Sequence, residues 1–101
     1  MSSHTFSRIA RVNNPKGLHL RPAGLLAQMA GRFQSQIELT NDGLTVNARS
    51  VLDLLTLVAT AGSQLTVTAR GEDAQEAVDA LADFIETDTT EDEQHVATGG
   101  T

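Results

Sequence analysis

A short stretch near the N-terminus, Gly17-Leu-His-Leu-Arg-Pro-Ala23, combines residue types that can bind and transfer an anion. His19 is followed two residues later by Arg21, and Pro22 is compatible with the first turn of a helix. Free amides and the positive end of the helix dipole attract anions at such a position, phosphate above all. An imidazole with a pKa near about 6.5 is also largely a neutral nucleophile at cellular pH. The stretch therefore predicts that His19 receives a phosphoryl group and hands it on.

Arg21 fits the same chemistry, because a guanidinium stays charged and can bind two phosphate oxygens at once. The alternative interpretation is an ordinary exposed cation. The three histidines (His4, His19 and His95) do not show metal-ligand spacing, and the chain has no cysteine. We therefore expect neither a metal site nor a cofactor.

The composition indicates one domain with an aliphatic core. The chain has 101 residues, 40% of them hydrophobic, with three Phe and no Trp or Tyr. It shows no secretory signal and no apolar run of the ~20 residues that span a bilayer, so we expect a cytoplasmic protein.

Charge is distributed unevenly along the chain. The net charge is −6, yet the first 50 residues hold six of the seven basic residues and only two of the thirteen acidic ones. Positive potential around His19 would attract phosphate and acidic protein surfaces. A nucleic-acid binder is the weaker interpretation, since stacking aromatics are missing and the overall charge is acidic.

The first half of the chain predicts two strands that flank a helix, followed by a return strand. Residues 5–12 are predicted to form a strand, anchored by Phe6 and by Ile9 or Val12. A helix is predicted over residues 20–30 from the apolar spacing of Ala23, Leu26, Ala27 and Ala30, and it should end at Gly31. Residues 35–40 alternate, with Ile37 and Leu39 on one face. Asn41-Asp-Gly43 is typical of a hairpin turn, and Leu44, Val46 and Ala48 alternate on the return strand.

The second half predicts a short helix, a strand and a long helix. Ser50 is a good N-cap, Asp53 stands where a capping-box acid would, and we expect the apolar helix that follows to end near residues 61–62. Residues 64–70 alternate as a strand. Asp73 is expected to cap the last helix, whose apolar stripe is Ala74, Ala77, Val78, Leu81, Ala82 and Ile85.

The element order is β-α-β-β-α-β-α, which predicts an α+β open-faced sandwich with the helices on one side of the sheet. Residues 1–87 would form this domain. Residues 88–101, polar, acidic and then glycine-rich, are expected to be a disordered tail.

Over residues 5–87 the sequence resembles the family of the histidine-containing phosphocarrier protein HPr of the bacterial phosphotransferase system. Residues 17–23 are similar to the family's Gly-Leu-His-x-Arg-Pro-Ala active-site signature. Arg49-Ser-Val-Leu-Asp-Leu-Leu55 resembles the segment around its regulatory serine, and Gly71-Glu-Asp-Ala-Gln-Glu-Ala77 its entry into the last helix. The resemblance implies four antiparallel strands covered on one side by three helices.

The resemblance also implies a carrier rather than an enzyme. It implies that Enzyme I transfers a phosphoryl group to Nδ1 of His19, and that a downstream sugar-specific component of the EIIA type receives it. Arg21 and the residues at the helix start (Gly17, Pro22 and Ala23) would stabilise the phosphate. The protein would act as a monomer without entering a membrane.

Two regulatory features stay open. Ser50 corresponds to a serine that an ATP-dependent kinase phosphorylates in many family members, although a plain N-cap would also explain it. The apolar residues Val51, Leu52 and Leu55, together with Leu20, are either core or a surface on which partners dock. The segment after Ser50 also occurs in the nitrogen-branch paralogue NPr. The sequence therefore leaves two interpretations open. The protein is either a phosphocarrier for sugar uptake, or a nitrogen-branch or purely regulatory protein whose phosphorylation state is recognised by a kinase or a transcriptional regulator.

Overall fold

The computed structural model describes residues 4–87, which form four strands and three helices. The predicted tail lies outside these residues. The elements are β1 (Thr5–Arg11), α1 (Leu20–Ala30), β2 (Gln36–Asn41), β3 (Leu44–Asn47), α2 (Val51–Thr56), β4 (Gln64–Arg70) and α3 (Ala74–Glu86).

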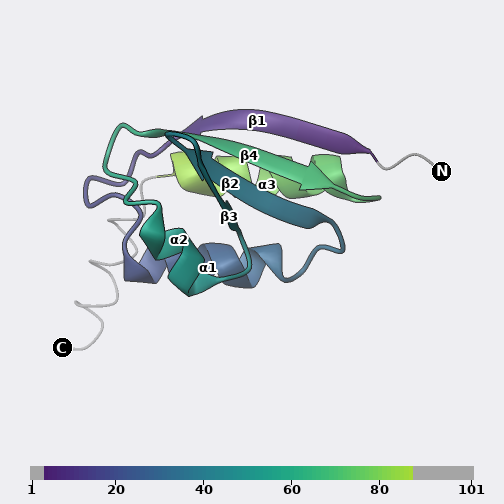
Figure 1. The fold of residues 1–101 in the computed structure, drawn as a ribbon, viewed down its shortest axis with the longest axis horizontal. Coiled ribbons are helices and arrows are strands. Elements are labelled where there is room, and N and C mark those ends of the chain that lie inside the picture. The colour runs from purple at the N-terminus through teal and green to yellow at the C-terminus, as the bar shows by residue number, and fades with distance from the viewer. Residues whose placement is uncertain (1–3, 88–101) are drawn as a thin grey trace.

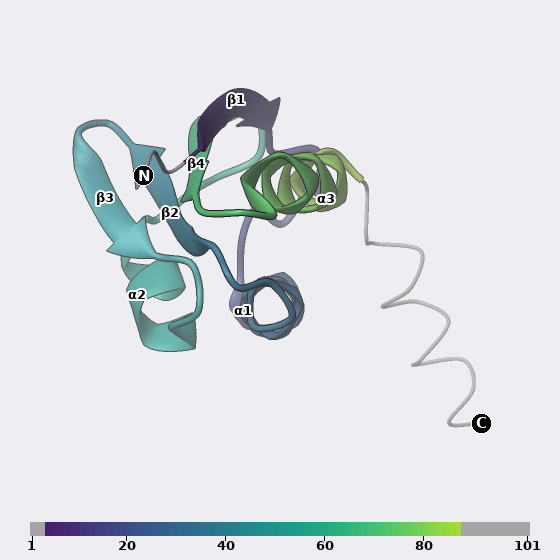
Figure 2. The same ribbon diagram turned by 90° about the vertical axis from the view of Figure 1, so that its right-hand side faces the viewer.

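The strands form one antiparallel sheet in the order β1-β4-β2-β3, so the last strand of the chain lies in the middle (Figure 1). The three helices lie on one face of this sheet, as the end-on view shows (Figure 2). Within residues 4–87, no helix covers the opposite face (Figure 2). The architecture confirms the predicted α+β open-faced sandwich. No helix of the described part is both long and apolar enough to cross a bilayer.

The core lies between the sheet and the helices and is built from aliphatic side chains. Alternate residues of β2 and β4 point into it, as the period-2 pattern predicts. The predicted stripe of α3 and the predicted face of α1 are buried as well. The fully buried large side chains are Leu26, Ile37, Leu39, Leu54, Leu65, Leu81 and Val67.

The apolar anchors at the first strand are Phe6 and Val12, one of the two alternatives that the sequence allowed. Val12 is buried and Phe6 packs against the core, but Ile9 is 61% exposed. Side chains alternate along a strand, so residues at even positions face the helices here, and Ile9 must point to the open face. Of the two alternative anchors, the structure therefore selects Val12 and not Ile9.

The hairpin between β2 and β3 is confirmed. Asp42 and Gly43 both have positive φ, 50° and 83°, as a two-residue turn of this type requires. Helix α1 also ends where predicted, but Gly31 has a φ of −66° and caps the helix in a right-handed conformation. The end of helix α1 therefore does not depend on the ability of glycine to adopt a positive φ.

Helix α2 is shorter than predicted. It ends at Thr56 rather than near residues 61–62. The chain leaves the helical path after Leu57, because Val58 has a left-handed backbone conformation with a φ of 49°. A right-handed helix cannot continue through such a residue. Leu57 and Ala59, on either side of it, are buried.

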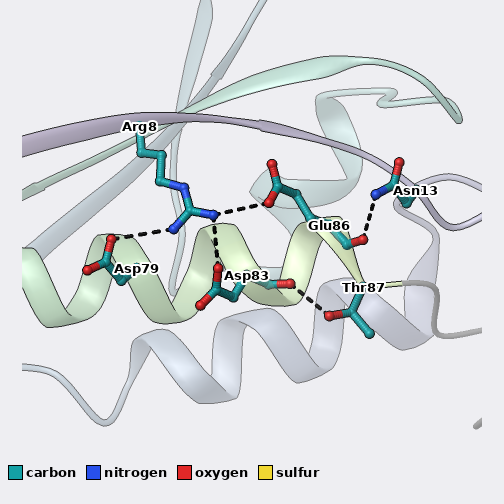
Figure 3. A network of polar contacts seen from close by, with 6 residues as sticks. All are labelled: Arg8, Asn13, Asp79, Asp83, Glu86 and Thr87. Atoms are coloured by element: carbon teal, nitrogen blue, oxygen red, sulfur yellow. Dashed lines mark hydrogen bonds and ion pairs between the residues drawn. The ribbon is translucent and has the colours of Figure 1, made fainter.

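Arg8 joins β1 to α3 through three carboxylates (Figure 3). Its guanidinium lies 3.4 Å from Asp79, 2.9 Å from Asp83 and 3.1 Å from Glu86, which follow one another along the helix. The hydrogen bond to Asp83 and the charges of Asp83 and Glu86 raise the pKa of Arg8. The contacts orient α3 along the edge strand.

Asp73 joins the start of α3 to the connection between α1 and β2. It occupies the predicted N-cap position, but its carboxylate makes no capping hydrogen bond. It instead accepts the N–H groups of Gln34 and Ser35, both at 2.9 Å, and the buried Ser35 hydroxyl at 2.5 Å. These hydrogen bonds, that of the Ser35 hydroxyl first, lower the pKa of Asp73.

We predict that Asp73→Asn destabilises the protein at neutral pH, because an amide must turn a donor towards one of the N–H groups. The lowered pKa means that the carboxylate stabilises the fold above the unfolded value of about 3.9 and loses this effect as pH falls through the folded value. The difference in melting temperature between wild type and variant should therefore be full at pH 7 and shrink below about pH 4. Glu72→Gln, a neighbouring exposed carboxylate, is the control. Equal melting temperatures of wild type and Asp73→Asn at pH 7 would contradict the prediction.

Candidate functional site

His19 is the N-cap residue of α1. Its backbone is extended, with φ −93° and ψ −168°, and its carbonyl accepts the Ala23 N–H at 2.9 Å. The amides of Leu20 and Arg21, in the first turn, are too early in the helix to have an intrahelical partner. The imidazole therefore lies where free amides and the positive end of an eleven-residue helix meet.

The loop before His19 is fixed by a tight turn at Gly17. The Gly17 N–H donates to the Asn14 carbonyl at 2.8 Å, and the buried Asn14 side chain accepts the Lys16 N–H at 3.0 Å. Gly17 has a φ of 74°, and a Cβ there would lie 2.6 Å from the Ala59 carbonyl oxygen. Only glycine fits both the backbone conformation and the space.

Three backbone hydrogen bonds join this loop to the segment between α2 and β4. Leu18 N–H donates to the Ala59 carbonyl at 2.8 Å. Val12 N–H donates to the Ser63 carbonyl, and Gly62 N–H donates to the Val12 carbonyl, both at 2.8 Å. We call these the interloop hydrogen bonds. They set where His19 stands relative to α2.

The side chains of the site differ in exposure. His19 is half-buried with its Nε2 atom buried, whereas Arg21 is exposed. Pro22 and Ala23 are buried in the first turn. In the described residues, no group of three or more His, Asp or Glu side chains is placed to hold a metal ion.

The predicted phosphate-stabilising residues thus divide into two kinds. Pro22 carries no N–H, and the amides of Gly17 and Ala23 already donate within the loop and the helix. These three residues hold the backbone of the site. Arg21 is the one predicted phosphate-stabilising residue with a charged side chain, and that side chain is exposed.

Three of the four predicted docking residues lie on helix α2, and the fourth, Leu20, is the first residue of α1. Leu52 is 76% exposed, and Leu20, on α1, is 66% exposed. Val51 and Leu55 are half-buried and pack against the core, while Leu54 is fully buried. The apolar cluster is therefore both core and surface, and its surface part is Leu20 and Leu52.

Ser50 is the N-cap of α2, as predicted. Its hydroxyl oxygen accepts the Asp53 N–H at 3.2 Å. The reciprocal half of a capping box is absent here, because the Ser50 N–H donates to the Asn47 carbonyl at 3.1 Å instead of to Asp53. Ser50 is half-buried at the helix start.

Sequence reasoning missed two residues that shape the site. The Arg49 guanidinium donates to the carbonyls of Ala30 and Ser35, at 3.3 and 3.1 Å, and to that of Phe33. It thereby ties the residue before Ser50 to the C-terminal end of α1. Val58 is the other, and an isolated valine gives no sequence signal for a left-handed backbone, which costs a β-branched residue about 1–3 kcal/mol.

Comparison with known proteins identifies the family. A family model described as "PTS HPr component phosphorylation site" matches residues 6–87. The chain belongs to the HPr family. The chain is 44% identical to HPr-like protein Crh of Bacillus subtilis over 70 residues, 69% of this chain and 82% of that relative. It is 40% identical to phosphocarrier protein HPr of Buchnera aphidicola over 82 residues, 81% and 96% of the two chains.

Solved structures agree with this assignment. Phosphocarrier protein HPr from Bacillus anthracis superposes with a TM-score of 0.78 at 40% identity, covering 80% of this chain and 96% of that one. A structure of Bacillus subtilis Crh superposes with a TM-score of 0.66 at 41% identity, covering 78% and 91%, and is described as a dimer with a swapped domain. The solved structures therefore support the assignment of this chain to the HPr family.

We predict that Gly17→Ala destabilises the protein by about 2 kcal/mol or more, because the new methyl group meets backbone atoms and the left-handed φ becomes strained. Gly24→Ala is the matched control. Gly24 lies inside α1 with no atom within 4 Å of a Cβ, so alanine there should stabilise by up to about 1 kcal/mol. Urea unfolding measures both. A Gly17→Ala variant as stable as wild type would show that the loop is not held as described.

Proposed function

We propose that this member of the HPr family carries a phosphoryl group on His19. The observation that supports it most directly is the position of the imidazole at the N-cap of α1, with the amides of Leu20 and Arg21 beside it. Negative charge that arrives with a phosphoryl group is stabilised there by the helix dipole. Arg21 adds an exposed positive charge two residues from His19, and its guanidinium can bind two phosphate oxygens at once.

Nδ1 of His19 is the proposed nucleophile. Because Nε2 is buried, Nδ1 is the ring nitrogen that a donor protein would have to reach. The lone pair of Nδ1 forms the N–P bond as the bond from phosphorus to the donor's leaving group breaks. Transfer to the acceptor reverses this step, with the acceptor side chain attacking phosphorus and the imidazole leaving.

The proposed donor is phosphorylated Enzyme I, and the proposed acceptor is a downstream component of the EIIA type. Both must cover the same histidine, so they would bind in turn on Leu20, Val51, Leu52 and Leu55. Apolar contact next to His19 would exclude water from the phosphoramidate during transfer. The chain would work in the cytoplasm as a stoichiometric carrier, and we expect a monomer.

We predict that His19→Ala abolishes phosphorylation while the fold persists. Intact mass is measured after incubation with Enzyme I, phosphoenolpyruvate and magnesium. Wild type should gain one acid-labile phosphoryl group, and the variant none, because no other described residue has this environment. His4→Ala, at an exposed histidine, is the matched control and should be phosphorylated like wild type. Phosphorylation of His19→Ala would contradict the proposal.

A regulatory function is the second candidate, and the similarity to Crh favours it. The structure supports Ser50 as its site in one respect. A phosphate on this hydroxyl would add about two negative charges at the start of α2, one residue from Val51 and two from the exposed Leu52. An apolar partner surface would then have to desolvate that charge. An ATP-dependent serine kinase and a regulator that reads the phosphoserine would be the partners.

We predict that Ser50→Asp slows phosphorylation by Enzyme I roughly tenfold, equivalent to about 1.4 kcal/mol of lost transition-state binding. The rate is followed by mass spectrometry at substrate concentrations below KM. Thr45→Asp, on β3 and exposed, is the matched control and should leave the rate near that of wild type. An unchanged rate in Ser50→Asp would argue against regulation through docking.

A further inference from the structure

The last described residue, Thr87, lies beside the loop that carries His19. Asn13, at the base of this loop, holds the end of α3 in place, because its side-chain N–H donates to the Glu86 carbonyl at 2.6 Å (Figure 3). Thr87 itself lines the same small cavity as Leu18, the residue before His19. The chain that follows Thr87 therefore starts next to the proposed phosphorylation site.

The surface around His19 carries positive charge that no described carboxylate neutralises. Lys16 and Arg21, three residues before His19 and two after it, are both exposed. All ion pairs within residues 4–87 are made by Arg8, so neither of these two side chains is paired there. Residues 12–37 also contain no Asp or Glu. A carboxylate that binds to these two basic side chains must therefore come from another part of the chain or from a partner.

The segment directly after Thr87 has the opposite charge and lies beyond residues 6–87, which the family model matches. An extended chain advances by about 3.3–3.6 Å per residue, so six residues span roughly 20 Å. That length is sufficient to reach the basic side chains from the cavity that Thr87 and Leu18 share. Residues 88–93 include no basic residue and four acidic ones, Asp88, Glu91, Asp92 and Glu93.

We propose that residues 88–93 bind across Lys16 and Arg21 and thereby inhibit phosphorylation of His19. The inference rests on the proposed function and adds a regulation of the same site. A protein that covers the imidazole must also cover these two side chains, so it competes with the segment. A short linker gives the segment an effective concentration in the millimolar range, and ion pairs that are weak one by one are then sufficient for competition.

A phosphoryl group on His19 would release the segment. It adds about two negative charges beside Arg21, which repel the carboxylates of residues 88–93. Because the segment and the phosphoryl group exclude each other, each weakens the binding of the other by the same factor. The segment would therefore cover the unphosphorylated site and leave the phosphorylated site accessible.

Lys16 is the one lysine of the chain, which allows a direct test of the contact. A water-soluble carbodiimide joins a lysine amine to a carboxylate that touches it, with loss of one water molecule. At low salt we expect an amide bond between Lys16 and a carboxylate of residues 91–93, identified by mass spectrometry of proteolytic peptides. The cross-link should disappear at about 1 M NaCl, where the Debye length is about 3 Å. Its absence at low salt would overturn the inference, whether or not His19 accepts phosphate.

A triple variant tests the inhibition itself: Glu91→Gln, Asp92→Asn and Glu93→Gln in one chain. We expect KM for this chain in phosphorylation by Enzyme I to fall about threefold or more, because the segment no longer competes. The value of kcat should stay unchanged, since a competitor that has left does not alter the bound complex.

The matched control neutralises three carboxylates elsewhere, on the open face of the sheet and at the start of α3: Glu38→Gln, Glu72→Gln and Glu76→Gln. It changes the net charge by the same amount and should leave KM near that of wild type. Equal KM values for the two triple variants would overturn the inference and leave the proposed function standing. If wild type accepts no phosphate, the proposed function fails and the inhibition fails with it, while the cross-link still shows whether the segment binds.

Discussion

The arrangement of the site depends on the hydrogen bond from the Leu18 amide to the Ala59 carbonyl. It joins the loop that carries His19 to the residues that follow α2, and the other interloop hydrogen bonds, through Val12, hold the base of the same loop. Backbone atoms make all three, so no side chain takes part in them directly. They require instead that Gly17 has no Cβ and that Val58 keeps an unfavourable φ. A reactive histidine is thus positioned mainly by main-chain geometry.

The elements that were predicted well are those where local pattern and tertiary packing agree. Helix α1 has the predicted bounds, β4 has the predicted bounds and buried face, and the Asp42-Gly43 turn has the predicted positive φ angles. In these elements the hydrophobic periodicity, the helix-capping residues and the turn residues all specify the same structure. His19 could likewise be singled out, because a histidine, an arginine and a proline at a helix start form a local pattern.

The remaining features arise from contacts that sequence periodicity does not encode. The pattern of residues 5–12 did not distinguish Ile9 from Val12 as an anchor, and only the pairing of β1 with β4 shows that Ile9 lies on the open face. Helix α2 was predicted to be longer because Leu57, Val58 and Ala59 continue its apolar sequence, whereas only Leu57 and Ala59 are buried, and they lie in a loop that is hydrogen-bonded to Leu18. Arg49 and Asp73 both act on backbone groups 14 or more residues away. Such pairs depend on the finished fold, so no window of sequence predicts them.

The strand order has a consequence for how the chain must fold. Strand β4 pairs with β1 on one side and with β2 on the other, although it is the last strand to leave the ribosome. Until residues 64–70 arrive, β1 has no partner in the sheet, and only the β2–β3 hairpin can form locally. Pairing of β1 with β4 then closes a loop of more than fifty residues, which is slow because its ends are far apart along the chain. The helices α1 and α2 and the hairpin can form early, while the site itself is completed only when β4 joins the two halves of the sheet.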